Sequence, residues 1–225
     1  MRSNSMAWLA GLSDHPVCLL EGGYKRYRQW VLQSFETPWS FKVLGGRTGT
    51  GKTDLLLELE GQNVAVVDLE GLAHHRGSSF GNLGLPEQPS TEHYENQLAE
   101  TLEGHARRRA SEIWLEAESA QVGRCRIPGA LFQQMQLAPV LEIRRSDQER
   151  INRLVDVYAV HDATALREAT ERIQRRLGPQ RTRVALEAID QQRWDDACLA
   201  MLAYYDGCYD RELERKPASS TIDLE

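Results

Sequence analysis

The amino-acid sequence predicts an α/β fold in which a parallel sheet is covered by helices, followed by a helical appendage. Short apolar runs typical of buried strands alternate with amphipathic segments from residue 41 to residue 143. Beyond Arg145 only helical patterns remain. Because parallel strands are joined by crossovers, usually helices, this order indicates a parallel sheet with both faces covered.

Length and composition place the chain among globular proteins. Its 225 residues allow one large domain, or one domain with a fragment of another. Hydrophobic residues make up 41% and charged residues 27% of the chain, which argues against a disordered polymer. No apolar run approaches the roughly 18 residues of a membrane-spanning helix, and no signal peptide is predicted. A membrane protein is therefore not expected.

Charge and cysteine content limit the partners and the compartment. The formal net charge is −6, so a nucleic-acid partner would have to bind a local basic patch. All but four of the 27 basic residues are arginine, which suits phosphate recognition, although a biased genomic composition gives the same result. The four cysteines form no CxxC pair, which argues against a structural zinc site and a disulfide framework. A reducing cytoplasm is the predicted compartment.

The pattern of residues 1–37 predicts a small unit of helix, strand and helix. Residues 5–12 are amphipathic, residues 17–20 form a short apolar run suited to a buried strand, and residues 24–35 carry apolar side chains at helical spacing. A unit of about 35 residues buries too little surface to fold alone. We therefore expect it to belong to, or pack on, something larger.

Residues 38–216 are predicted to form the α/β domain with its helical part. Strands are expected at residues 41–44, 64–69, 113–115 and 140–143, and the helices between them at residues 54–60, 92–109 and 131–137. The intervening loop 70–89 is rich in Gly, Ser and His and long enough to suggest a function. Ser146 and Glu149 form a capping box that begins a helix. Further helices are expected at residues 163–177, 184–189 and 193–205, and a polar, disordered tail at residues 217–225.

A phosphate-binding loop lies between the first strand and helix of this domain. Residues 46–53, GRTGTGKT, match the pattern GxxxxGK[ST] in full. Its glycines let successive backbone N–H groups surround phosphate oxygens, and the helix N-terminus adds a favourable dipole. Lys52 would neutralise the terminal phosphates and Thr53 would offer its hydroxyl to Mg²⁺. The predicted phosphate-binding residues are Gly46, Thr48, Gly49, Gly51, Lys52 and Thr53. The sequence thus predicts a P-loop NTPase-like sheet, with the phosphate ligand left open.

Carboxylates follow two of the predicted strands. Asp68 ends the second strand, and Glu116 and Glu118 follow the third. The carboxyl ends of parallel strands meet at the edge where the phosphate loop lies, the place for a Mg²⁺ ligand or a water-orienting group. Asp68 is the first candidate and the two glutamates compete with it. A solvated strand end is the alternative for all three.

The loop after Asp68 and two later arginines are candidate contacts for substrate or RNA. His74, His75, Arg76 and Ser78 lie between glycines and offer several donors suited to a phosphate or an RNA backbone. Adjacent histidines in an extended loop point apart, so they do not predict a zinc site. Arg124 and Arg126 follow the third strand, on the side where ligands enter such a sheet. Solvated surface is the alternative, and Cys125 between them is either a reactive thiol or incidental.

Several of these motifs together resemble bacterial tRNA 2-selenouridine synthase. The resemblance depends on the phosphate loop and on the segments DLEGLAHHRGSSFG (residues 68–81), WLEAES (114–119), GR (123–124) and IP (127–128). Members of that family join an N-terminal rhodanese domain to a C-terminal phosphate-loop domain. Residues 1–37 resemble the last third of the rhodanese domain.

The resemblance implies a tRNA-modifying transferase. Its substrate would be 2-thiouridine at the wobble position, in the anticodon stem-loop of tRNA. The sulfur would first be geranylated by geranyl diphosphate, and selenium from selenophosphate would then replace it. No tightly bound cofactor is implied, and Mg²⁺ is an optional partner of the diphosphate.

The sequence departs from the family at its start. The rhodanese nucleophile, a cysteine, would lie a few residues before Met1, and Cys18 does not match it. We therefore expect selenium transfer by this chain to be impaired unless a separate rhodanese domain assists, and no catalytic residue is assigned. Two other readings stay open: a small-molecule kinase or NTPase, and a non-catalytic tRNA-binding module.

Overall fold

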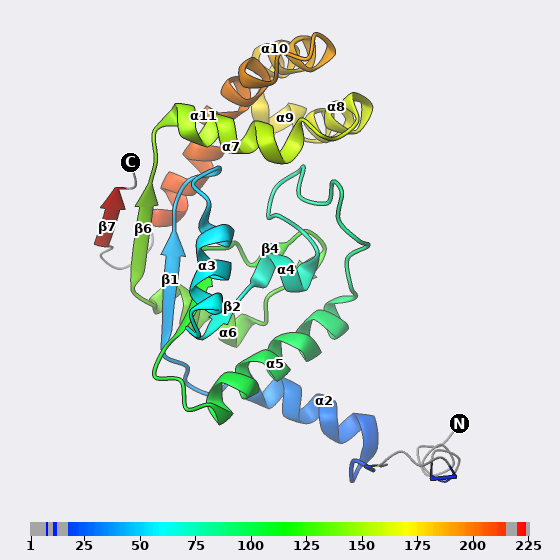
Figure 1. Cartoon of the computed structure of the whole chain (residues 1–225). Helices are drawn as coiled ribbons and strands as arrows, with labels where there is room; N and C mark the ends of the chain where they lie inside the picture. Colours follow the sequence, from blue (N-terminus) through cyan, green and yellow to red (C-terminus); the bar gives the residue numbers. More distant parts are fainter. Residues whose placement is uncertain (1–7, 9–10, 13–17, 215–219, 224–225) are drawn as a thin grey trace.

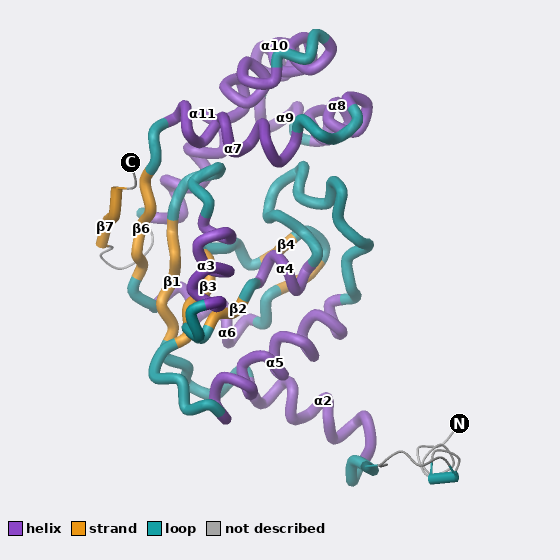
Figure 2. The backbone as a smooth tube through the Cα atoms, in the orientation of Figure 1, coloured by secondary structure: helices purple, strands orange, loops and turns teal. Residues whose placement is uncertain are grey.

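The computed structural model describes residues 8, 11–12, 18–214 and 220–223. A parallel sheet lies at its centre, with strand order β2-β3-β1-β6-β7. The strands are β1 (Phe41–Gly45), β2 (Val66–Val67), β3 (Ile113–Glu116), β6 (Val140–Arg144) and β7 (Ser220–Asp223). A separate antiparallel pair consists of β4 (Gln121–Val122) and β5 (Cys125–Arg126). Figures 1 and 2 show the sheet with helices around it.

The helices divide into those around the sheet and those of the appendage. The first group comprises α2 (Gly23–Ser34), α3 (Lys52–Gly61), α4 (Leu69–Ala73), α5 (Thr91–Arg107) and α6 (Gly129–Leu137). The appendage comprises α7 (Asp147–Tyr158), α8 (Ala163–Arg172), α9 (Gln174–Leu177), α10 (Pro179–Asp190) and α11 (Trp194–Leu213). No helix in the described part of the chain combines the length and apolar character that a bilayer crossing requires.

Alternating side chains of the central strands form cores on both faces of the sheet. Val43 belongs to the larger core, with side chains of α2, α5 and α6, while its neighbour Leu44 packs on the other face with Leu56 of α3. A third core lies inside the appendage and includes Phe80 from the long loop. The predicted α/β architecture with a parallel sheet is confirmed.

The parallel strands bring the functional segments to one edge. In the register of β1 with β3, Leu44 lies opposite Glu116, so the phosphate loop after Gly45 begins beside the end of β3. Figure 1 shows the arrowheads of β1 and β6 directed toward the appendage. The ligand edge of the sheet therefore faces the helices that follow β6.

Two predictions at the chain ends are wrong in the described residues. Residues 18–20 form no strand, and Leu19 and Leu20 are 56% and 57% exposed, since no described segment pairs with them. The rest of the predicted strand and most of helix 5–12 lie outside the described residues. Ser220–Asp223 is not a disordered tail but forms β7, which pairs with β6. Thr221 and Ile222 are of β-branched residue types, which are enriched in strands.

Other differences concern element boundaries. The predicted strand 64–69 is reduced to Val66–Val67, because Asp68 caps a short helix, α4, inside the predicted loop. The predicted helix 163–177 breaks at Ile173 into α8 and α9. Helix α11 continues to Leu213, well beyond the predicted end at residue 205. The capping box of Ser146 and Glu149 is confirmed at the start of α7.

Candidate functional site

The phosphate loop connects β1 to α3 as the sequence predicts. Gly46, Gly49 and Gly51 have φ values of 150°, 84° and 81°, in the region that favours glycine. At Gly49 a Cβ would lie 2.8 Å from the carbonyl oxygen of Arg150, so a larger residue would displace α7. The loop conformation therefore depends on both its backbone and its neighbours in the appendage.

All predicted phosphate-binding residues line one cavity. Lys52 donates a hydrogen bond from Nζ to the carbonyl oxygen of Gly46, at 2.8 Å, which folds its side chain back over the loop. The residues of the loop that line the cavity are Gly46, Thr48, Gly49, Gly51, Lys52 and Thr53. A loop of this kind can surround a phosphate group and neutralise its charge.

A cluster of carboxyl groups, of which Glu116 is fully buried, lies against the loop. Thr53 Oγ1 donates to Glu70 Oε2 and to Glu116 Oε2, each at 3.2 Å. The backbone N–H of Glu70 donates to Glu116 Oε1 at 3.1 Å. Carboxylate oxygens of Glu70, Glu116 and Glu118 lie within 4.8 Å of one another. Two of the three predicted carboxylates thus meet at the site.

Asp68 has another role in the structure. Its Oδ1 accepts a hydrogen bond of 2.8 Å from the backbone N–H of Gly71, which caps α4. Glu70, in the first turn of α4, lies in the acidic cluster instead. Sequence reasoning missed Glu70 because the strand was predicted to continue through Leu69, which placed Glu70 at the start of a loop. The Asp–x–x–Gly spacing that begins α4 was the available signal.

Burial and mutual repulsion raise the pKa values of these carboxyl groups. Burial, followed by the negative charges of Glu70 and Asp68, raises the pKa of Glu116 to about 8. Burial also raises the pKa of Glu70, with a contribution from Asp68, and that of Glu118, with contributions from Glu116 and Glu70, while Lys52 opposes the shift at each. Oxygen ligands are what Mg²⁺ prefers, and a cation would relieve the repulsion. The cluster with Thr53 therefore fits the predicted Mg²⁺, although Asp68 does not belong to it.

The histidine-containing loop contributes some of its predicted residues to the cavity. His75, Arg76 and Ser78 line it, whereas His74 ends α4 with Nδ1 3.0 Å from the carbonyl oxygen of Glu87. Arg76 donates from Nη1 to the carbonyl oxygen of Leu83, at 2.8 Å, which bends the loop back on itself. His75 Nδ1 is buried without a hydrogen-bond partner in the described structure, and burial lowers its pKa.

Arg124 and Arg126 do not line the cavity. Both are exposed on the β4–β5 hairpin, and Arg124 Nη2 forms an ion pair with Glu87 at 3.0 Å. Cys125 between them is fully buried, and burial raises the pKa of its thiol. A reactive thiol in an electropositive setting is therefore wrong for Cys125. The hairpin turns at Gly123 after β3, which carries the arginines away from the phosphate loop.

The cavity continues from the loop to the helical appendage. Its volume is about 1390 Å³, and its far side is formed by side chains of α7, α8, α9 and α11. Arginines and tyrosines dominate there: Arg153, Tyr158, Arg172, Arg175, Arg176, Tyr204, Tyr205 and Tyr209. Helical periodicity alone indicates only a solvated face for arginines such as these, because their common orientation depends on how the helices pack.

An apolar recess of about 70 Å³ opens beside the phosphate loop. Its walls consist mainly of side chains from α7, α8, α10 and α11, including Leu154, Leu166, Ile189, Trp194 and Met201. Thr48, Ser78, Leu154, Tyr158 and Tyr205 line both the recess and the large cavity. The two spaces are therefore neighbours that share a wall at the loop.

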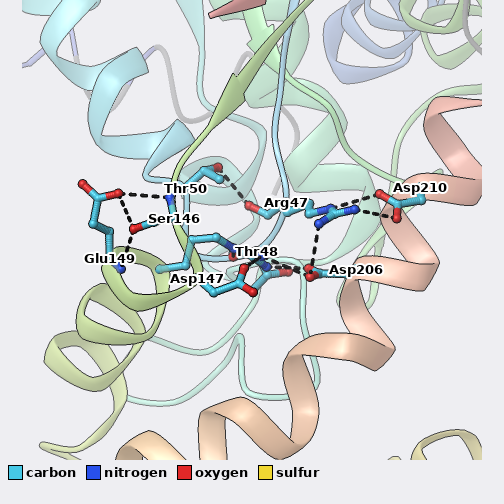
Figure 3. A network of polar contacts seen from close by, with 9 residues as sticks. Arg47, Thr48, Thr50, Ser146, Asp147, Glu149, Asp206 and Asp210 are labelled. Atoms are coloured by element: carbon cyan, nitrogen blue, oxygen red, sulfur yellow. Dashed lines mark hydrogen bonds and ion pairs between the residues drawn. The ribbon is translucent and has the colours of Figure 1, made fainter. Parts of the chain in front are cut away.

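Arg150 of α7 joins the phosphate loop to the appendage. Its side chain is only 2% exposed, donates from Nε to the carbonyl oxygen of Thr48 at 2.9 Å, and forms ion pairs with Asp147 and Asp206. Figure 3 shows this network, in which Arg47 also pairs with Asp206 and Asp210 of α11. Buried, charge-assisted hydrogen bonds of this kind fix geometry.

Comparisons with known proteins agree on one family. A family model described as the tRNA 2-selenouridine synthase AAA domain matches residues 39–223. A protein of Marinobacter nauticus named tRNA 2-selenouridine synthase is 35% identical over 237 residues, covering 90% of this chain and 62% of the relative. Its namesake from Sulfurovum sp. is 35% identical over 239 residues, covering 92% and 64%. One from Shewanella halifaxensis is 43% identical over 156 residues, covering 67% and 40%. The chain thus spans 62–64% of the length of the first two relatives.

Proposed function

The chain belongs to the tRNA 2-selenouridine synthase family, and we propose that its phosphate loop binds geranyl diphosphate for transfer to the 2-thiouridine of tRNA. The relatives' names support tRNA modification as the activity. The overall conversion would be of wobble 2-thiouridine to 2-selenouridine through an S-geranyl intermediate, with selenophosphate as the selenium donor.

One observation supports this ligand over a nucleotide: the apolar recess borders the phosphate loop. Thr48 and Ser78 line both spaces, so a ligand with its diphosphate on the loop has an apolar wall beside it. A nucleoside would bring ribose hydroxyls and base edges toward Leu154, Trp194 and Met201, which offer them almost no hydrogen bonds. An isoprenoid chain has no hydrogen bonds to lose there, and the transfer of its apolar surface out of water is favourable.

The proposed reaction needs no protein nucleophile. The sulfur of 2-thiouridine attacks C1 of the geranyl group, the C1–O bond breaks, and the uracil N3 proton passes to solvent. Diphosphate leaves with its negative charge next to Lys52 and the loop N–H groups, which is where stabilisation of the transition state is most effective. Thr53, Glu70, Glu116 and Glu118 would hold Mg²⁺, which when bound neutralises diphosphate charge.

Selenium transfer is assigned to a second step with a different nucleophile. The selenium of selenophosphate would attack C2, and the C2–S bond would break so that geranylthiol leaves with a proton from solvent. Water would then cleave the Se–P bond and release phosphate, leaving 2-selenouridine. In the family this step involves the rhodanese cysteine, and Cys18, which is exposed, does not match it. We propose that residues 1–37 are the C-terminal part of such a rhodanese domain, residues 38–216 form the P-loop domain, and selenium delivery requires a rhodanese segment beyond this chain.

The experiment supplies each donor separately. The 225-residue chain is incubated with 2-thiouridine tRNA and either geranyl diphosphate or selenophosphate, and the nucleosides are analysed by mass spectrometry. We expect S-geranyl-2-thiouridine with the first donor and no 2-selenouridine with the second. Selenouridine formed without an added rhodanese domain would contradict the division of steps.

The other readings have their own signatures in the same assay. Release of phosphate from ATP or GTP, with no change in the tRNA, would favour the kinase or NTPase reading. Binding of tRNA with no product from either donor would favour a non-catalytic binding module. Lys52→Ala is the control that ties any product to the phosphate loop.

A further inference from the structure

The wall of the large cavity opposite the phosphate loop consists of charged and aromatic side chains from α8, α9 and α11. We propose that this wall binds single-stranded RNA, with Arg172, Arg175 and Arg176 on the backbone phosphates and Tyr204 stacked on a base. The inference rests on the proposed function, in which a tRNA anticodon is the second substrate.

The size of the cavity indicates room for two ligands. Small-molecule sites occupy about 300–1,000 Å³, whereas this cavity measures about 1390 Å³. The phosphate loop is the proposed site of the diphosphate, and the recess of about 70 Å³ is the proposed site of part of the hydrocarbon tail. The remaining surface, on α8, α9 and α11, is free for the acceptor nucleotide, which a transferase must bind at the same time as the donor.

The arginines of this wall are oriented but not neutralised. Among the described residues, the ion pairs of α8, α9 and α10 involve Arg167 and Arg183 and none of the three cavity arginines. Arg172 donates from Nη2 to the carbonyl oxygen of Ser79, at 2.9 Å, so a neutral contact fixes its position. In a protein of net charge −6, exposed arginines without carboxylate partners form a local site for an anion.

The neighbouring tyrosines suit bases better than a second phosphate group. Tyr204 and Tyr205 have ring centroids 5.1 Å apart at 67°, and Arg176 opposes the rise that burial causes in the pKa of Tyr204. Aromatic rings beside arginines are the arrangement by which proteins bind unpaired nucleotides. Arg153, by contrast, lies directly against Gly51 of the phosphate loop and serves the diphosphate side.

The test compares two pairs of exposed arginines, one in the cavity wall and one outside it. Arg175→Ala/Arg176→Ala removes two cavity arginines, and Arg181→Ala/Arg183→Ala removes two exposed arginines of α10 that do not line the cavity. Binding of a fluorescent anticodon stem-loop RNA with 2-thiouridine is measured by anisotropy over a range of salt concentrations. In parallel, geranyl diphosphate binding is measured by calorimetry on the same proteins.

We expect the cavity pair to weaken RNA binding about tenfold or more and to reduce the salt slope by about 1.4, since each single-strand phosphate contact contributes about 0.7. The affinity of the cavity variant for geranyl diphosphate should stay within about twofold of that of the unmodified chain. The RNA affinity of the α10 variant should also stay within about twofold. Tyr204→Leu weakens RNA binding about fivefold or more, while Tyr204→Phe retains it, because stacking requires the ring and not the hydroxyl.

Three results would overturn the inference. If the cavity pair binds RNA normally but loses geranyl diphosphate, these arginines belong to the donor site. If both pairs weaken RNA binding equally, the contact is a diffuse charge effect. If the unmodified chain binds geranyl diphosphate but no RNA at low salt, the tRNA part of the proposed function fails as well. If the Arg175→Ala/Arg176→Ala variant binds RNA normally, this inference alone is refuted.

Discussion

The two walls of the cavity differ in how their positions are determined. On the sheet side, glycine conformations, the buried Arg150 and a carboxyl cluster around the buried Glu116 fix each group. On the appendage side, Arg175 and Arg176 are exposed on the short helix α9. The first wall is preorganised for one small, highly charged group. The second can adapt to a flexible polymer, which suggests that donor and acceptor are recognised by different physical means.

Substitution of Arg150 is expected to have the largest effect on stability and ligand binding, because this arginine joins the two walls. Arg150→Met leaves Asp206 partly unpaired and the Thr48 carbonyl without its donor. Breaking a buried ion pair from one side costs about 3–5 kcal/mol. We expect a loss of this size in the free energy of unfolding, measured by urea denaturation, together with weaker geranyl diphosphate binding.

A matched exposed arginine is the control for that prediction. Arg167 of α8 pairs with Asp190 at 2.6 Å, but its side chain is 35% exposed. Ion pairs at the protein surface contribute about 0–1 kcal/mol to the free energy of unfolding. A similar loss of stability in Arg167→Met and Arg150→Met would mean that Arg150 does not join the walls in the way described.

Lys52→Ala acts on the sheet-side wall alone. The lysine donates one hydrogen bond to Gly46 within the loop and otherwise contributes charge to the ligand site. We expect geranyl diphosphate affinity to fall by about 100-fold or more, which is about 2.7 kcal/mol, with little change in Tm. Lys42→Ala, on β1 and outside the cavity, should leave both unchanged. Unchanged affinity in Lys52→Ala would remove the phosphate loop from the mechanism.

The sequence predicted the sheet-side wall much better than the appendage wall. The motif at residues 46–53 is local, so its spacing alone placed Lys52 and Thr53 correctly, and Glu116 followed from the end of β3. Glu70 was missed because one capping hydrogen bond from Asp68 decides where β2 ends and α4 begins. The arginines of α8 and α9 needed the tertiary packing, since helical periodicity does not say which exposed face borders a cavity.

Glu116→Gln sharpens the description of the sheet-side wall through pH. With its pKa raised to about 8, Glu116 binds a proton in the folded protein that the unfolded chain releases near its ordinary value of about 4.3. Ionisation therefore disfavours folding increasingly as pH rises between these values. We expect the variant to have the higher Tm at pH 8, by several degrees, and the difference to shrink toward pH 5.

Differential scanning fluorimetry over that pH range measures the effect, with exposed Glu60→Gln as the control. Added Mg²⁺ should raise the Tm of the unmodified protein more than that of Glu116→Gln, because the cation offsets the repulsion among the carboxylates. A Tm difference that grew as the pH fell would contradict the assignment of a raised pKa.

The smallest effect is expected on a third surface, the β4–β5 hairpin. Arg124 and Arg126 were predicted as RNA contacts from their place after β3, but the structure puts them outside the cavity, with Arg124 paired to Glu87. Because that guanidinium already has carboxylate and carbonyl partners, an RNA phosphate would have to displace them. We expect Arg124→Ala/Arg126→Ala to weaken anticodon stem-loop binding by no more than about twofold at 0.1 M salt, a change of about 0.4 kcal/mol. Anisotropy with the same RNA measures it beside the Arg175→Ala/Arg176→Ala variant. If the hairpin pair weakens binding as much as the cavity pair, RNA passes over both surfaces, and the contrast between a donor wall and an acceptor wall is too simple.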